Sequence, residues 1–182
     1  MMVDLGEEAG RRAREYKYHG VDMSIMAPLM QPFWRTAVMW LPEWMAPNLV
    51  TLLGFISMVC ASAVVSFYSL DFSTPAPAWV YFFVSGALFF YQTMDALDGK
   101  QARRTGCSSP LGELFDHGCD AMMTVLIAVI SCQVFQVGQS WPIVYLCVAS
   151  PMLPFFATQW EEYHLNKFIL GRLGVTEAQL IL

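Results

Sequence analysis

Two long stretches without a charged residue limit what this chain can fold into. No Asp, Glu, Lys or Arg occurs between Asp71 and Asp95, or between Asp120 and Glu161. A helix of about 20 residues crosses the hydrocarbon core of a bilayer, so each stretch is long enough to contain a crossing. With 56% hydrophobic residues and a mean hydropathy of +0.45 over 182 residues, the chain is too apolar for an ordinary soluble domain. The sequence therefore predicts a helical membrane protein.

Proline and capping residues divide the apolar sequence into helices. Pro47 and Pro110 suit the first turn of a helix, where the missing N–H of proline costs nothing, and Ser109 is a good cap before Pro110. The predicted fold is an all-α integral membrane protein with about four transmembrane helices in a membrane core at residues 47–160. We expect these helices at about residues 47–70, 78–103, 110–137 and 142–160.

The segments on either side of this core are more polar. Residues 1–46 form an N-terminal arm in which Trp34 and Trp44 lie among prolines and other tryptophans. Tryptophan suits the headgroup layer, so we expect a helix of this arm to lie along the membrane surface. Residues 161–182 form a tail, in which Thr176–Gln179 has the pattern of a capping box that opens a further helix.

Charge predicts how the chain lies in the membrane. With four crossings, the arm, the loop at about 99–110 and the tail share one side, and all the basic residues fall on that side. The positive-inside rule places this side in the cytosol. The net charge of −5 argues against a nucleic-acid partner. The ten Lys and Arg residues are at positions 11, 12, 14, 17, 35, 100, 103, 104, 167 and 172.

Four aspartates within 26 residues interrupt the apolar sequence. Asp95 and Asp98 are three residues apart, and Asp116 and Asp120 are four apart, so each pair shares one helix face. If the pairs meet, repulsion and desolvation require cations to neutralise them. Carboxylates without a cysteine or histidine cluster favour Mg²⁺ or Mn²⁺ over zinc. Two such ions are our first interpretation; the alternative is salt bridges to Lys100, Arg103 and Arg104.

The spacing of the motif is D-x2-D-G-x2-A-R-x8-G-x3-D-x3-D from Asp95 to Asp120. This pattern resembles the signature of the CDP-alcohol phosphotransferases. The sequence around the motif, with PNLVT at 47–51 and WEEYH at 160–164, is similar to sequences of the choline/ethanolamine phosphotransferase branch. The resemblance implies an enzyme of phospholipid synthesis. It would transfer phosphocholine or phosphoethanolamine from CDP-choline or CDP-ethanolamine to diacylglycerol, giving phosphatidylcholine or phosphatidylethanolamine and CMP.

Residues near the aspartates suit a diphosphate. Gly99, Ala102 and Gly112 remove side chains where a diphosphate must approach the backbone, although tight helix packing is the other explanation. Arg103 offers a guanidinium fork for phosphate oxygens. The resemblance implies a CDP contact at Arg103 and at Asn48, which otherwise suits a helix cap. The expected CDP-alcohol site therefore consists of Asn48, Gly99, Ala102, Arg103 and Gly112.

His117 is the expected proton acceptor. Aspartates bound to cations are poor bases, whereas a neutral imidazole can take a hydroxyl proton at physiological pH. The resemblance implies a proton-accepting histidine at this position of the branch. Glu113 lies four residues before His117 on the same helix, so it could orient the imidazole or act as the base itself.

The resemblance also implies a location and alternatives. The family builds its chamber from six helices, whereas this sequence ends as a fifth begins, so we expect a truncated N-terminal portion. One alternative function is a catalytically incomplete membrane fragment that pairs with a complete subunit. The other is a different CDP-alcohol phosphatidyltransferase, making phosphatidylinositol or phosphatidylglycerophosphate. We expect endoplasmic reticulum or Golgi membranes with the site facing the cytosol; a homodimer and either headgroup are compatible with the sequence.

Overall fold

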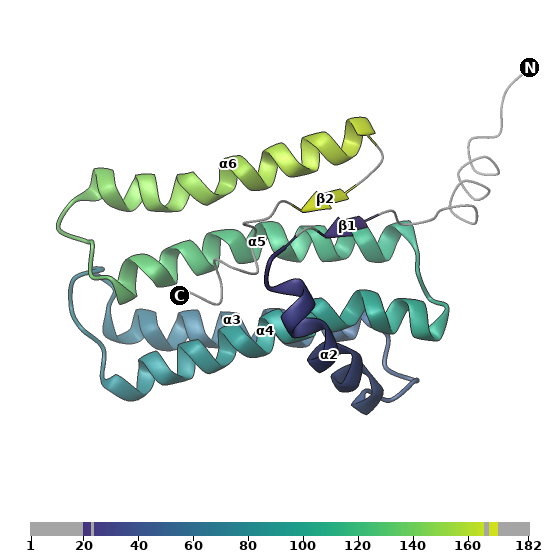
Figure 1. The fold of residues 1–182 in the computed structure, drawn as a ribbon. Helices are drawn as coiled ribbons and strands as arrows, with labels where there is room; N and C mark the ends of the chain where they lie inside the picture. The colour runs from purple at the N-terminus through teal and green to yellow at the C-terminus, as the bar shows by residue number, and fades with distance from the viewer. Residues whose placement is uncertain (1–19, 23, 166–167, 171–182) are drawn as a thin grey trace, which may run out of the picture.

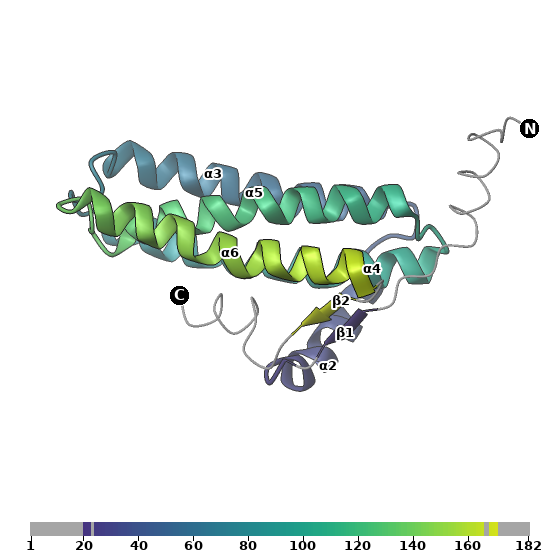
Figure 2. The same ribbon diagram turned by 90° about the horizontal axis from the view of Figure 1, so that it is seen from above.

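Four long helices lie side by side and form the body of the molecule (Figure 1), and Figure 2 shows the same packing from above. The computed structural model describes residues 20–22, 24–165 and 168–170. Successive helices run in opposite directions, as short loops require. The four helices are α3 (Pro47–Tyr68), α4 (Ala78–Thr105), α5 (Pro110–Val134) and α6 (Trp141–Leu165).

Length and composition support a membrane location. Among the described helices, α3, α5 and α6 are long and apolar enough to cross a membrane. The longest helix, α4, has 28 residues and carries its charged residues in its last turns. Large apolar side chains such as Phe82 and Phe67 remain 80% and 79% exposed, which suits a surface that faces lipid. The predicted all-α membrane fold is confirmed, and three of the four helices expected to cross the membrane meet this criterion, α4 being the exception.

Local signals position the helix ends. Pro47 stands in the first turn of α3, but the cap is Ala46, so Asn48 does not cap this helix. Ser109 caps α5, where its Oγ accepts a hydrogen bond of 3.1 Å from the Gly112 N–H. At the end of α4, Gly106 adopts a left-handed conformation with φ 68°, which suits glycine and stops the helix.

The largest differences from the predicted helix ends are in α5 and α6. The helix α5 ends at Val134 because Gln136 turns left-handed, with φ 56°, and the Val137 N–H donates back to the Cys132 carbonyl. The helix α6 ends at Leu165 instead of residue 160, since the Glu-Glu-Tyr-His sequence after Trp160 continues it. Its last turns therefore bring two more glutamates onto the helix.

A short helix, α2 (Ala27–Ala37), packs against α4 and continues into the 3₁₀ turn η1 (Val38–Trp40). Trp34 is buried in a cluster with Val50 and Leu97, whereas Trp40 and Trp44 are 78% and 77% exposed. Exposed tryptophans beside a buried face suit a helix on the membrane surface.

The end of α4 holds the chain that follows α2. Arg104 Nη1 donates to the Val38 and Leu41 carbonyls, at 2.9 and 2.8 Å, and Gln101 Nε2 donates to the Pro42 carbonyl at 2.9 Å. These bonds fix the segment that leads into α3.

The prediction of a wholly helical chain missed one feature. The strands β1 (Gly20–Asp22) and β2 (Phe168–Leu170) pair in parallel, with Gly20 opposite Phe168. This backbone pairing joins the segments before α2 and after α6, so no local sequence pattern reports it. The capping box expected at Thr176–Gln179, and residues 1–19 of the arm, lie outside the described residues.

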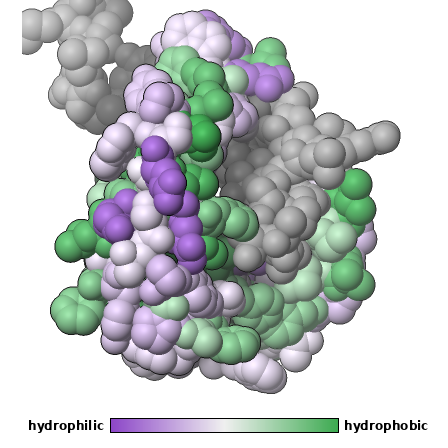
Figure 3. Space-filling view, turned by 90° about the vertical axis from the view of Figure 1, so that its left-hand side faces the viewer, coloured by the Kyte–Doolittle hydropathy of each residue, from purple (hydrophilic) through white to green (hydrophobic). Residues whose placement is uncertain are grey.

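The loops at the opposite end of the bundle, residues 69–77 and 135–140, lie against each other (Figure 1). Figure 3 looks onto this end, where hydrophilic and hydrophobic surfaces are mixed. The Gly138 N–H donates to the Phe72 carbonyl at 2.9 Å. The N–H groups of Thr74 and Ser73 hold the pKa of the exposed Asp71 carboxyl below its usual range. Both loops lack basic residues.

The bundle is closely packed where α3 meets α4. A Cβ placed on Gly54 would lie 3.0 Å from Met94 Cβ and 3.3 Å from Tyr91 Cδ2. Glycine therefore lets the two helices approach at the level of Tyr91, one turn before the first aspartate of the motif.

Candidate active site

The helices α4 and α5 bring the predicted aspartates together. Carboxylate oxygens of Asp95, Asp98 and Asp116 lie within 4.8 Å of one another. The Asp120 carboxyl faces that of Asp95, and the Asp116 carboxyl faces that of Asp98. The same-face spacing read from the sequence therefore produces one cluster of four carboxyl groups.

The structure indicates that this cluster fits a divalent cation. Asp98 is only 7% exposed, and Asp116 Oδ1 is buried with no hydrogen-bond partner among the described residues. A buried carboxylate oxygen without a hydrogen-bond partner, surrounded by other carboxyl groups, is unfavourable unless a cation binds it. Oxygen ligands at this separation suit a hard ion. All four aspartates are available to hold such ions.

Two side chains that the sequence analysis did not select hold the carboxylates in place. Thr51 Oγ1 donates to Asp98 Oδ2 at 2.6 Å, and the Gly99 N–H donates to Asp98 Oδ1. The Tyr91 hydroxyl donates to Asp120 Oδ1 at 2.8 Å. Thr51 ends the PNLVT stretch, which was the available signal, whereas nothing near Tyr91 marks it in the sequence.

Two of the three basic residues of the motif, Arg104 and Lys100, make contacts outside the aspartate cluster. Arg104 pairs with Glu43 at 3.2 Å. Lys100 Nζ donates to the Ala96 carbonyl at 3.2 Å and lies 5.2 Å from the centre of the Trp34 ring. Among the described residues, no ion pair joins an aspartate of the cluster to Lys or Arg. The salt-bridge alternative is therefore wrong for this part of the chain.

The expected CDP-alcohol residues fall into two adjacent groups. A Cβ on Gly112 would lie 3.4 Å from Asn48 Oδ1, so the starts of α3 and α5 meet there. A Cβ on Gly99 would lie 3.5 Å from Arg103 Nη1, so the guanidinium folds back over the space that glycine leaves. Ala102 is half-buried on α4, and its carbonyl accepts a hydrogen bond from the Cys107 N–H at 3.0 Å. Its expected contact with the CDP-alcohol stays a prediction.

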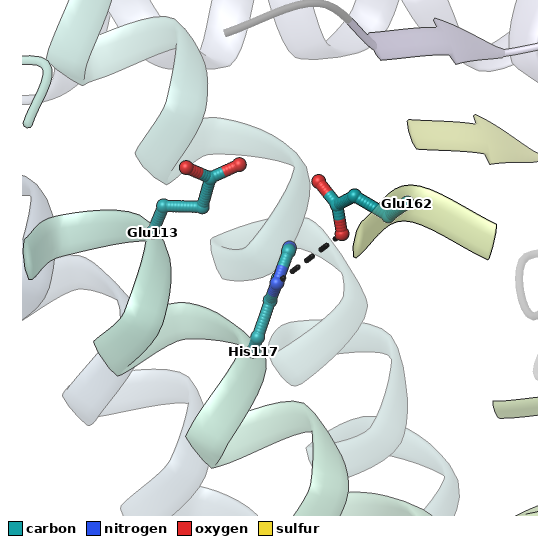
Figure 4. Close-up of side chains that lie close together, drawn as sticks. All are labelled: Glu113, His117 and Glu162. Carbon is teal, nitrogen blue, oxygen red and sulfur yellow. Dashed lines mark ion pairs between the residues drawn. The ribbon is translucent and has the colours of Figure 1, made fainter. Parts of the chain in front are cut away.

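His117 on α5 lies between two glutamates (Figure 4). Glu113 is one turn earlier on the same helix, and Glu162 comes from α6. Its Nδ1 is 3.7 Å from Glu162 Oε2, and one ligand atom each of Glu113, His117 and Glu162 lie within 4.8 Å of one another. The ion pair joins His117 to Glu162 on α6 and not to Glu113, the partner suggested by helix spacing. The only sequence signal for Glu162 was its place in WEEYH.

Membrane-length helices that close around four carboxyl groups define a polytopic membrane protein with an acidic, metal-fitting site. Residues 44–176 match the CDP-alcohol phosphatidyltransferase family, and the chain belongs to that family. Membership confirms the resemblance, and the family depends on divalent metal ions in general.

Two relatives have names that state their enzyme class. The chain is 40% identical over 172 residues to cholinephosphotransferase 1 of Mus musculus, covering 94% of this chain and 43% of that protein. It is 43% identical over 176 residues to choline/ethanolaminephosphotransferase 1 of Arabidopsis thaliana, covering 96% of this chain and 44% of that protein. The chain therefore spans less than half the length of these relatives.

Proposed function

We propose that this chain serves the transfer of phosphocholine or phosphoethanolamine from a CDP-alcohol to diacylglycerol. The observation that carries the proposal is the cluster of Asp95, Asp98 and Asp116, with Asp120 against Asp95, within the family's region of similarity. The names of the relatives support this chemistry and do not favour the alternative of a non-catalytic interaction fragment.

The CDP-alcohol would bind across the starts of α3 and α5 and the end of α4. Asn48 and Gly112 lie together on one side, and Gly99 with Arg103 on the other. Arg103 would donate to phosphate oxygens, while the glycines leave room for the diphosphate near the backbone.

The four aspartates would hold two divalent ions, with Mg²⁺ the expected metal and Mn²⁺ a substitute. When bound, such ions neutralise charge on the diphosphate. Tyr91 and Thr51 would keep two of the carboxylates oriented toward the ions through the hydrogen bonds described above.

His117 would take the proton of the diacylglycerol hydroxyl, and Glu113 is the alternative base. As the proton leaves, the lipid oxygen bonds to the β-phosphorus. The bond from that phosphorus to the oxygen shared with CMP breaks, and its electron pair leaves with CMP. A base aligned with the attacking hydroxyl typically contributes about 10²–10⁴-fold to the rate.

We also propose that the site faces the cytosol, in endoplasmic reticulum or Golgi membranes. Of the described basic residues, Lys100, Arg103 and Arg104 are in the last turns of α4, whereas the loops at 69–77 and 135–140 contain none. This asymmetry is the one expected for a cytosolic side, where a water-soluble nucleotide is supplied.

The direct test is an assay of membranes that contain the chain, with diacylglycerol and either CDP-choline or CDP-ethanolamine. Phosphatidylcholine or phosphatidylethanolamine and CMP should form with Mg²⁺ or Mn²⁺, and both should disappear with a chelator. Asp71→Asn is the matched control, since Asp71 is exposed and Asn keeps an oxygen for the N–H groups of Ser73 and Thr74. Full turnover in chelator, or no product from either donor with both metals supplied, would contradict the proposal.

A further inference from the structure

Glu162 is a sheltered acidic side chain that the proposed transfer does not yet use. It comes from the last turn of α6, and its Oε2 lies 3.7 Å from His117 Nδ1. The side chains of His117 and Glu162 are only 18% and 19% exposed. Because both side chains are mostly buried, water screens this contact less than it would at the protein surface.

The contact distinguishes the two ring nitrogens. A neutral imidazole carries one proton, and a carboxylate facing Nδ1 favours the form with the proton on Nδ1. In that form Nε2 is the unprotonated nitrogen, and its lone pair can accept a proton, as a base needs. A carboxylate that orients a catalytic histidine in this way is a recurring arrangement in enzymes that activate a hydroxyl.

We propose that Glu162 is the positioning residue for His117: its carboxylate holds the Nδ1 proton and the ring orientation, so that Nε2 accepts the hydroxyl proton. The proposal rests on the proposed function only for what His117 does, since the contact itself belongs to the structure. It gives α6 a part in a site whose other groups come from α3, α4 and α5.

Glu113 does not fill the same role. It precedes His117 by one turn on α5 and lies in the same group of three, but the ion pair is formed from α6 (Figure 4). Its carboxyl faces Glu162 as well as the ring. Glu113 therefore remains available as the alternative base, while Glu162 sets the state of the imidazole.

The first test measures which ring nitrogen of His117 carries the proton, and it does not depend on turnover. The chain has three histidines, His19, His117 and His164, so histidine labelled with ¹⁵N in the ring gives a simple spectrum, and His117→Asn assigns the signal. In lipid nanodiscs, at one alkaline pH where the ring is neutral, the wild type should show a protonated Nδ1. Glu162→Gln should move the ring toward the Nε2-protonated form, whereas Glu162→Asp should retain the original one.

The second test measures transfer. Glu162→Gln should lower kcat about 10–100-fold with the KM for the CDP-alcohol unchanged within about twofold, as is typical for loss of a group that orients a functional histidine. Glu162→Asp should recover part of the rate. The control is Glu161→Gln, because Glu161 is the exposed neighbour on the same turn and its loss removes equal charge.

The outcomes separate the two proposals. A wild-type ring protonated on Nε2, or a tautomer unaffected by Glu162→Gln, overturns the positioning role, and the wild-type spectrum decides this even if a variant does not fold. A KM effect without a kcat effect also overturns it. If the wild type transfers no headgroup at all, the proposed function fails, and the spectra still decide the role of Glu162.

Discussion

Thr51 on α3 donates a hydrogen bond of 2.6 Å to Asp98 on α4, between residues 47 positions apart in the chain. Thr51 is only 4% exposed, and the bond fixes the orientation of the carboxylate before any ion binds. Since Asp98 also accepts from the Gly99 N–H, both its oxygens are oriented by the protein. Asp98 is therefore the most constrained of the four candidate ligands.

Replacing Thr51 should weaken metal binding. Thr51→Val keeps the shape of the side chain and removes the hydroxyl, so the affinity for Mn²⁺, measured by electron paramagnetic resonance, should fall about 10-fold or more. Thr51→Ser keeps the hydroxyl and should bind nearly as the wild type does. Equal affinity in the Val and Ser variants would show that the hydrogen bond does not matter for the metal.

Neutralising the aspartates should abolish transfer. In Asp98→Asn and Asp116→Asn, an amide replaces a charged oxygen ligand, and we expect each variant to lose measurable transfer of the headgroup while inserting normally into membranes. Membrane insertion is checked by extraction with alkaline carbonate, and transfer by product mass. Substantial activity in either variant would favour a structural role for the cluster.

The variant His117→Ala should show whether His117 acts as a base or as a metal ligand. If His117 takes the hydroxyl proton, kcat should fall about 10²–10⁴-fold while binding of the CDP-alcohol and of Mn²⁺ barely changes. The comparison variant is Glu113→Gln. Normal turnover in His117→Ala together with loss of turnover in Glu113→Gln would move the base to Glu113.

The loops at the far end of the bundle should be sensitive to a single methyl group. A Cβ on Gly138 would collide with the Asp71 carbonyl oxygen and would lie 2.7 Å from Phe72 Cβ. Gly138→Ala should therefore destabilise the protein by about 1–3 kcal/mol, seen as a lower Tm of the chain in detergent. Gly86→Ala is the control, since a Cβ there meets nothing within 4 Å and alanine favours a helix.

The sequence could predict the features that depend on neighbours along one helix. Pro47, Ser109 and Pro110 marked two helix starts because capping and proline act locally. The clustering of Asp95 with Asp98, and of Asp116 with Asp120, followed from helix periodicity alone. That the two pairs meet required the further argument that isolated carboxylates in a membrane are unfavourable.

Contacts between helices were beyond this reasoning. Thr51, Tyr91 and Glu162 reach the site from positions 29 to 47 residues away from the groups they contact, and periodicity carries no information on such pairs. Helix spacing instead suggested Glu113 as the partner of His117, because residues four positions apart on one helix are neighbours and the spacing says nothing about other helices. The two short strands were missed for the same reason.

The packing of Trp34 on the surface helix against Leu97 has a mechanical consequence. Leu97 directly precedes Asp98, and Arg104 and Gln101 tie the following turns of α4 to the same peripheral segment. We expect the headgroup layer to hold the exposed Trp40 and Trp44, and the lipid would then help to fix the position of the Asp98 carboxylate through this packing. Harsh delipidation should therefore inactivate the protein while its helical circular dichroism is still intact.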